Sequence, residues 1–271
     1  MIHTDRNLSQ RLERTEARSN AAFVEARAKL SPEIGAQWIE VAGAYAMFDG
    51  VGSPCTQTFG LGVFAEASPA DLEQLESFFH GHKASVCHEI SPMTDATLLP
   101  LLNERGYQPI DLSSVLFQSI DGGNSLAQSV NPNITTRIIE VGEEHLWAQT
   151  AAAGWAPEGG EIADFILGFG HVSAHCEGGF PFLAEIDGKA IASGMLFMFD
   201  GVALMAGAST VPDYRRQGAQ HALLDARLRY AGQNGCTIAM FAAAPGSQSQ
   251  RNAEKNGFRI AYTRTKWMLK T

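Results

Sequence analysis

The chain has 271 residues, of which 45% are hydrophobic, and a formal net charge of -9 at pH 7. This hydrophobic fraction favours packed cores over disorder, and the length fits one large or two ordinary domains. The acidic balance argues against nonspecific binding to nucleic acid or to anionic membranes, so neither partner is expected. A polar first segment without an apolar core and four scattered cysteines favour a reduced, cytoplasmic protein.

The first half of the chain alternates helical and strand-like patterns. In chain order these are a helix over 8–30, strands over 38–47 and 58–64, a helix over 69–79, a strand over 84–90, a helix over 94–105 and a strand over 113–120. His80, His82, Cys87 and His88 lie close together, but their spacing matches no common zinc pattern, so no metal site is predicted.

A polar segment rich in glycine and proline, 121–133, is typical of a linker. After it we expect a strand over 135–140, helices over 143–154 and 161–168, a hairpin of strands over 182–186 and 190–199, a strand over 202–209, a helix over 220–231 and a strand over 236–242. The sequence therefore predicts an α/β (α+β) protein with domains at 1–122 and 134–271, joined by a linker at 123–133.

The segment from Val211 to Gln220 connects a strand-like run to a helix-like run and contains Arg215, Arg216 and Gly218. A helix that starts in such a loop presents free backbone N–H groups, and the helix dipole favours an anion there. The two arginines add positive charge, and a glycine lets a bulky phosphate approach the backbone. We therefore predict that this loop binds a diphosphate.

The spacing Arg215-x-x-Gly218-x-Gln220 resembles the acetyl-CoA pyrophosphate loop of the GNAT acetyltransferase superfamily, although Gln220 stands where the family has glycine or alanine. A later run, 252–258, resembles the family's fourth helix, which ends in Glu-Lys-x-Gly-Phe. The resemblance covers 134–271. It implies acetyl-CoA as cosubstrate, bound by Ser209, Thr210, Val211, Arg215, Arg216, Gln217, Gly218, Ala219, Gln220, Ser249 and Asn252.

The two halves of the chain resemble each other, since the run 101–107 is similar to 252–258 and the elements follow in the same order. The segment of the first half that corresponds to the phosphate loop is 65–71, which has neither arginine nor glycine and contains Glu66 and Asp71. We therefore expect two tandem GNAT-like domains, each a mixed, mostly antiparallel sheet flanked by helices. The first is expected to be a degenerate copy without a cofactor loop.

For catalysis, the resemblance implies direct attack of an amine on the thioester, with an oxyanion stabilised by a backbone N–H near Thr210 or Val211. The family's acidic tyrosine corresponds to Ala253, so a usual proton donor is missing. Candidate catalytic residues are Glu185, Ser249 and Tyr230, together with Tyr262 and the acidic set Glu158, Glu161 and Asp164. For each carboxylate, a role as a solvated or capping group is favoured over a role as a base.

Two functions follow from these observations. The first is an acetyl-CoA-dependent N-acetyltransferase that acts on an amine of a small molecule or peptide. The second is a non-catalytic acetyl-CoA-binding sensor or partner-binding module, which the missing tyrosine and the degenerate half keep open. The sequence identifies neither the acceptor nor the oligomeric state.

Overall fold

The computed structural model describes residues 2–120 and 131–270. The chain forms two compact units: unit 1 contains Met1–Gln118 and Met240–Thr271, and unit 2 contains Ser119–Ala239. The predicted domains at 1–122 and 134–271 are the two halves of the sequence, whereas the two units are groups of residues in spatial contact. The predicted domain boundaries therefore stay a prediction. Most of the predicted linker, 123–133, lies outside the described residues.

Unit 1 is a mixed sheet with helices on both faces. Its elements are α1 (Arg6–Leu30), β1 (Gln37–Val41), β2 (Ala44–Phe48), β3 (Gln57–Phe59), α2 (Pro69–Gly81), β4 (Cys87–Ile90), α3 (Leu98–Glu104), β5 (Tyr107–Ser119), most of β10 (Ile238–Ala243), α7 (Gln248–Lys255) and β11 (Arg259–Leu269). The strand order is β1-β2-β3-β4-β11-β5-β10. Only the β3–β4 pair among those with a described register is parallel.

The strand predicted over 38–47 is wrong, because this segment forms the hairpin of β1 and β2. Its turn is Ala42-Gly43, and both residues have positive φ values, 49° and 77°. Val41 is paired with Ala44, so the chain reverses within two residues. The sequence shows Gly43 inside an alternating apolar pattern, and a period of two does not distinguish one strand from two joined by a tight turn.

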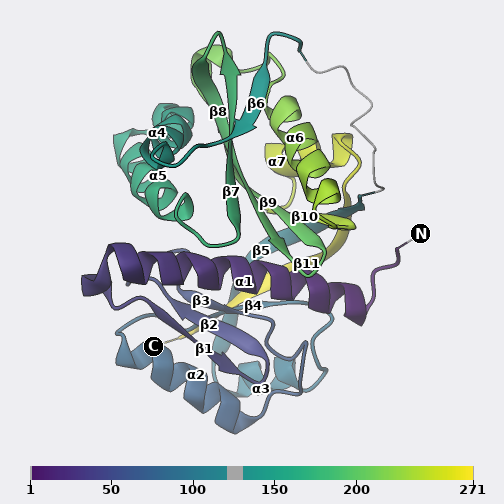
Figure 1. The fold of residues 1–271 in the computed structure, drawn as a ribbon. Coiled ribbons are helices and arrows are strands. Elements are labelled where there is room, and N and C mark those ends of the chain that lie inside the picture. Colours follow the sequence, from purple (N-terminus) through teal and green to yellow (C-terminus); the bar gives the residue numbers. More distant parts are fainter. Residues whose placement is uncertain (1, 121–130, 271) are drawn as a thin grey trace. The chain divides into compact units, whose positions relative to one another are not determined.

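The two faces of the unit 1 sheet bury different sets of residues. In β2, Ala44, Ala46 and Phe48 belong to the core formed with α2 and α3, whereas Tyr45 and Met47 belong to the core formed with α1. This alternation is the one expected of a strand that is buried on both faces. Figure 1 shows α1 on one face of these strands and α2 and α3 on the other.

The last strand of the chain is built into the first half of the sequence. β11 lies between β4 and β5 and pairs with both of them antiparallel. Its pairing with β5 extends from Arg259 opposite Phe117 to Leu269 opposite Tyr107. The C-terminal segment therefore completes the sheet of unit 1 and depends on strands that precede residue 120.

A buried group of charges holds β11 against α1 and β4. Arg264 is 2% exposed and lies 2.9 Å from Glu16, 3.5 Å from Glu13 and 3.8 Å from Glu89. Tyr262 donates its hydroxyl hydrogen to Glu13 at 2.8 Å. Burial raises the pKa of Glu13 to about 7, and the nearby Arg264 only partly opposes this effect.

The stability of the protein should therefore depend on Glu13 between about pH 4.5 and 7. In this range the unfolded chain loses the Glu13 proton while the folded chain keeps it, so this residue's contribution falls as pH rises through the window. The Glu13→Gln variant should lack that contribution and gain up to about 3 kcal/mol over the wild type above pH 7, relative to their difference at pH 4. Denaturant unfolding of both proteins across the range tests this, and parallel curves would contradict it.

Unit 2 is an antiparallel sheet between helices. Its elements are β6 (Thr135–Ile138), α4 (Glu144–Trp155), α5 (Gly160–Ser173), β7 (Gly179–Ile186), β8 (Lys189–Phe199), β9 (Val202–Thr210) and α6 (Ala219–Gln233), with short 3-10 turns at Ala156–Glu158 and Pro212–Tyr214. The strand order is β9-β8-β7-β6. The mixed α/β architecture with a mostly antiparallel sheet, as predicted, is thus present in both units.

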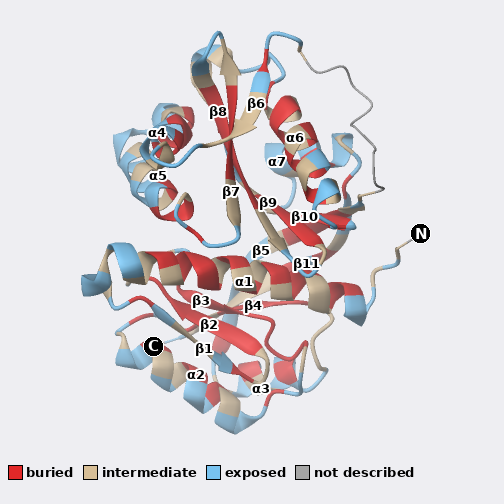
Figure 2. Ribbon diagram, in the orientation of Figure 1, coloured by how far each residue is buried: buried red, intermediate tan, exposed pale blue. Residues whose placement is uncertain are grey.

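The core of unit 2 lies between these layers. α4 packs on β8 and β9, and α6 packs on β7, β8 and β9, from opposite sides of the sheet (Figure 1). Trp147 of α4 is 2% exposed, lies against Leu183 and Met195, and donates its indole N–H to the carbonyl of Phe182 at 3.0 Å. β8 and β9 are buried along much of their length (Figure 2). No helix within the described residues is long and apolar enough to cross a membrane.

Candidate functional site

The start of α6 is open to an anion. Its N-cap is Gly218, which has a left-handed φ of 95° and supplies no side-chain cap. Arg216, two residues earlier, also has a positive φ, 64°, and its side chain is exposed. Successive backbone N–H groups at the start of a helix, beside a left-handed turn, form a concave donor surface that suits phosphate oxygens. The predicted helix start at this loop is confirmed to within one residue.

Arg215, in contrast, is engaged by the protein itself. Its Nη2 donates to the carbonyl of Gly154 at 2.7 Å, and its Nε donates to the carbonyl of Thr210 at 3.4 Å. Gly154 lies in the last turn of α4, so Arg215 satisfies a carbonyl at the negative end of that helix. It ties the loop to α4, and Arg216 is the cation that extends into solvent.

Gln220, which departs from the family's small residue, turns back toward β9. Its Nε2 donates to the carbonyl of Ser209 at 2.7 Å and to Oγ1 of Thr210 at 2.9 Å. The Ser209 hydroxyl donates to the carbonyl of Ala151 in α4 at 2.9 Å and is buried. These side chains therefore fix the junction of β9, α4 and α6. What the loop offers a ligand is mainly backbone N–H groups and Arg216.

The pairing of β8 with β9 is interrupted by a bulge. The register shifts between Ser193 opposite Ser209 and Met195 opposite Ala206, which leaves Gly207 and Ala208 without a partner position on β8. Gly207 has a φ of 56°, and both residues are exposed. These two residues of β9 stand against the single residue Gly194 of β8, and one extra residue of this kind disrupts the ladder locally, where a ligand can reach the backbone.

The expectation of a free N–H at Val211 is not met on the β8 side. Val211 N–H donates to the carbonyl of Ile191 at 2.9 Å, so it continues the ladder between the strands. The interruption in the register of β8 and β9 lies three to four residues earlier, at Gly207 and Ala208. The sequence signal for it is a glycine in each of two adjoining strands, Gly194 and Gly207.

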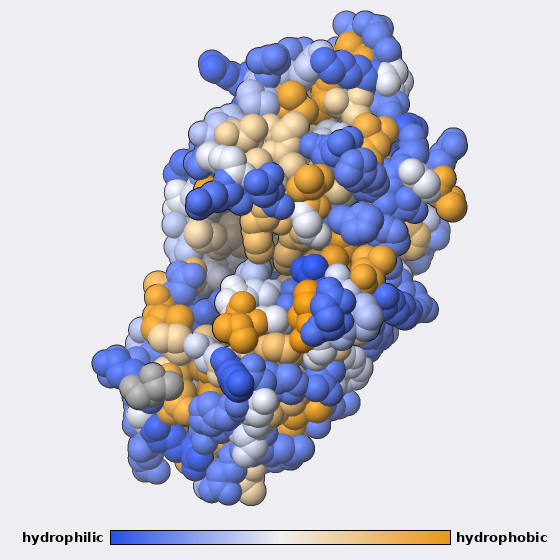
Figure 3. All heavy atoms as spheres, turned by 90° about the vertical axis from the view of Figure 1, so that its left-hand side faces the viewer, coloured by the Kyte–Doolittle hydropathy of each residue, from blue (hydrophilic) through white to orange (hydrophobic). Residues whose placement is uncertain are grey.

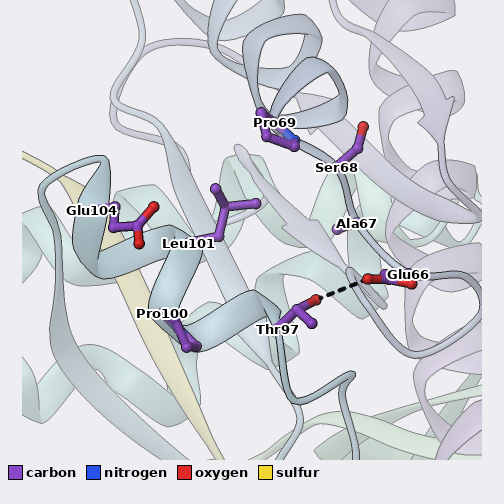
Figure 4. A pocket seen from close by; sticks show the side chains of 8 residues that line it. All are labelled: Glu66, Ala67, Ser68, Pro69, Thr97, Pro100, Leu101 and Glu104. Carbon is purple, nitrogen blue, oxygen red and sulfur yellow. Dashed lines mark hydrogen bonds between the residues drawn. The ribbon is translucent and has the colours of Figure 1, made fainter.

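The corresponding loop of the first half is closed by its own side chains. Ser68 and Asp71 form a capping box at the start of α2, in which Asp71 accepts the Ser68 N–H at 2.8 Å and Ser68 accepts the Asp71 N–H at 3.2 Å. A shallow pocket of about 480 Å³ lies beside it and includes Glu66, Thr97 and Glu104 (Figure 4). The acidic lining and the self-capped helix disfavour a diphosphate here.

The predicted base Glu185 lies at the β6–β7 pair and is bound to a cation. Arg137 of β6 contacts Glu185 at 2.7 Å and Glu143 at 2.5 Å. This guanidinium holds the pKa of Glu143 below its usual value. Glu185 is thus held in an ion pair with Arg137, and its role as a base stays a prediction.

The other catalytic candidates are distributed over both units. Tyr230 lies on α6, with its ring packed against Phe180 at 5.1 Å and Phe182 at 5.8 Å between centroids. Ser249 and Asn252 are exposed on α7, which belongs to unit 1. Their predicted contacts with a cofactor stay predictions. Tyr262 is buried and engaged by Glu13.

The outer surface of α4 and α5 combines acidic and apolar residues. The acidic set Glu158, Glu161 and Asp164 is exposed in and after the α4–α5 connection. Large apolar side chains are exposed beside it in the sequence, namely Leu146, Trp155, Ile162 and Phe165. On the side of unit 2 that carries these helices, Figure 3 shows apolar areas between hydrophilic ones. Within the described residues, no group of three or more His, Cys, Asp or Glu side chains is arranged to hold a metal ion.

Comparisons with known proteins agree with this geometry. The Acetyltransferase (GNAT) family matches residues 144–258, whereas no curated protein matches the chain in sequence. A GCN5-related N-acetyltransferase from Kribbella flavida has a similar structure, with a TM-score of 0.63, 19% identity, and coverage of 93% of this chain and 96% of that one.

Two further solved structures are also similar over most of the chain. A functionally unknown conserved protein from Staphylococcus epidermidis gives a TM-score of 0.61 at 11% identity, covering 87% of this chain and 94% of that one. A tandem GNAT protein from the clavulanic acid biosynthesis pathway gives 0.58 at 13% identity, covering 83% and 77% respectively. The family match thus shows a GNAT acetyltransferase domain at 144–258, and the solved structures show a similar fold over most of the chain.

Proposed function

We propose that the protein is an acetyl-CoA-dependent N-acetyltransferase with a single cosubstrate site in its second half. The observation that supports this most strongly is the contrast between two corresponding helix starts. α6 begins at a glycine without a side-chain cap and has the exposed Arg216 beside it. α2 begins with a capping box next to Glu66. Only the first combination attracts a diphosphate.

The bulge in β9 supplies the second requirement of acyl transfer. A thioester carbonyl becomes an oxyanion when an amine attacks it, and fixed backbone N–H groups stabilise that charge. Gly207 and Ala208 have no partner position on β8 and lie in the same unit as the phosphate loop. The proposal therefore assigns the diphosphate to the start of α6 and the acyl group to the bulge.

The acceptor is proposed to be a small-molecule or peptide amine. The acidic set Glu158, Glu161 and Asp164 would attract a protonated amine, and the exposed apolar side chains of α4 and α5 would contact an apolar portion of the same molecule. Release of CoA thiol from acetyl-CoA, measured against a panel of amines that differ in apolar size, tests the proposal. Tight acetyl-CoA binding without turnover on any amine would favour a non-catalytic sensor instead.

Turnover is expected to proceed without a tyrosine acid. Ala253 occupies the family's tyrosine position and cannot transfer a proton. The Tyr230→Phe and Ser249→Ala variants should each lower kcat by less than about tenfold, because positioned acid–base catalysis is typically worth more than that. Phenylalanine also preserves the ring packing on Phe180. A loss of several hundredfold in one variant, with acetyl-CoA binding intact, would identify a dedicated acid.

A further inference from the structure

One buried cation lies on a helix of unit 2. Arg227, on α6, is 3% exposed, and no carboxylate among the described residues forms an ion pair with it. Removing a guanidinium from water without a counter-charge is costly. Burial accordingly lowers the pKa of Arg227 to about 10. An apolar side chain at this position would avoid the cost.

Arg227 contacts the bulge between β8 and β9. Its Nη1 donates to the carbonyl of Met195 at 2.9 Å and to that of Ala206 at 3.3 Å, and these two residues form the last register pair before the bulge. Its Nε donates to the carbonyl of Leu223 at 3.1 Å, one turn earlier on its own helix. The guanidinium thus connects α6 to both strands at the point where their pairing fails.

The sequence at β8 is adapted to this side chain. A Cβ atom on Gly194 would lie 2.9 Å from Cζ of Arg227 and 3.0 Å from its Nη1, which is closer than such atoms approach. Glycine at 194 therefore leaves the space that the guanidinium fills. Gly194 is also the residue that the register skips on β8.

The contact with Ala206 has an electronic consequence on the exposed side of β9. The carbonyl of Ala206 and the N–H of Gly207 belong to one peptide group, so a cation on the oxygen makes the N–H a stronger donor. The charge acts on that peptide group with little screening by solvent, because Arg227 is 3% exposed. Gly207 itself is exposed.

We propose that Arg227 is a positioning residue for acyl transfer, which fixes the bulged backbone of Gly207 and Ala208 and strengthens the Gly207 N–H toward the thioester carbonyl. This inference rests on the proposed function. In the step concerned, the amine lone pair forms the C–N bond and the carbonyl π electrons move to oxygen. The oxyanion then collapses and the C–S bond breaks. The sulfur leaves as CoA thiolate, which takes a proton from water, and the amine proton passes to water.

The test is the carbonyl signal of [1-13C]acetyl-CoA bound to the full-length protein. In the wild type, binding should shift the 13C resonance downfield and lower the carbonyl stretching frequency. The Arg227→Met variant should lose at least half of both shifts while keeping its affinity for CoA within about threefold. Arg227→Lys should recover part of the shifts, because it restores the charge without the planar geometry. Arg229→Met is the matched control on the same helix, since Arg229 is 54% exposed and pairs with Asp225.

The outcomes distinguish the role of Arg227 from the proposed function. Bound acetyl-CoA with equal carbonyl shifts in the wild type and Arg227→Met would overturn the role of Arg227 and leave the proposed function standing. Absence of acetyl-CoA binding to the wild type would overturn the proposed function, and this inference with it. If Arg227→Met fails to fold, Arg227→Lys and Gly194→Ala decide: a shift reduced in both supports the proposal, and an unchanged shift in both overturns it.

Discussion

Replacing Gly218 by glutamate is expected to weaken acetyl-CoA binding by more than about 100-fold, or nearly 3 kcal/mol. The new carboxylate would stand at the N-cap of α6, where the proposal places the diphosphate. It would accept helix N–H groups itself, as the N-cap Ser68 accepts the Asp71 N–H at the start of α2, and its charge would repel the phosphates. Isothermal titration calorimetry with acetyl-CoA measures the loss.

The control for this variant must reproduce the backbone strain that any side chain at position 218 introduces. Gly218 has a φ of 95°, which any residue with a Cβ atom adopts at a cost of about 1–2 kcal/mol. The variant should therefore be less stable than the wild type, despite the favourable charge on the helix dipole. Gly218→Gln carries the same strain without the charge and should retain most of the affinity. Equal losses in the two variants would assign the effect to strain and contradict the loop assignment.

The second half of the sequence, expressed alone as 134–271, is expected to be insoluble or to self-associate. β11 would lose its pairing with both β4 and β5, which would leave two open strand edges. The buried Arg264 and Tyr262 would also lose their partner Glu13 on α1. Size-exclusion chromatography of the fragment tests the expectation.

The same experiment has an internal control. Coexpression of 134–271 with 1–122 supplies β4, β5 and α1 on a separate chain and should restore a soluble 1:1 complex. A monomeric fragment 134–271 whose affinity for acetyl-CoA equals that of the full-length protein would show that the pairing of β11 with β4 and β5 is not required.

The elements and the loop conformation before α6 could be predicted because they depend on local patterns. Ser68 and Pro69 specify the start of α2, Asp187 and Gly188 specify a hairpin turn, and both features are present in the structure. Gly218 at the start of α6 is a similar local signal. Such features depend on the conformational preferences of single residues and their neighbours.

The placement of β11 and the use of the loop side chains could not be predicted in this way. Nothing in the run 259–269 distinguishes pairing with β4 from pairing with a strand of its own sequence half, because an alternating strand fits either edge. Arg215 looks like a phosphate ligand in the sequence, but its hydrogen bond to Gly154 depends on where α4 ends. Arg227 looks like an ordinary exposed helix residue until Gly194 is placed opposite it.

The central claim is a single acetyl-CoA site that depends on the loop before α6. Calorimetric titration of the full-length protein with acetyl-CoA measures its stoichiometry and affinity directly. We expect one molecule of acetyl-CoA per chain, with binding lost in the Gly218→Glu variant. Two molecules per chain would show that the loop at 65–71 also binds the cosubstrate, and no binding at all would contradict the assignment of the α6 loop.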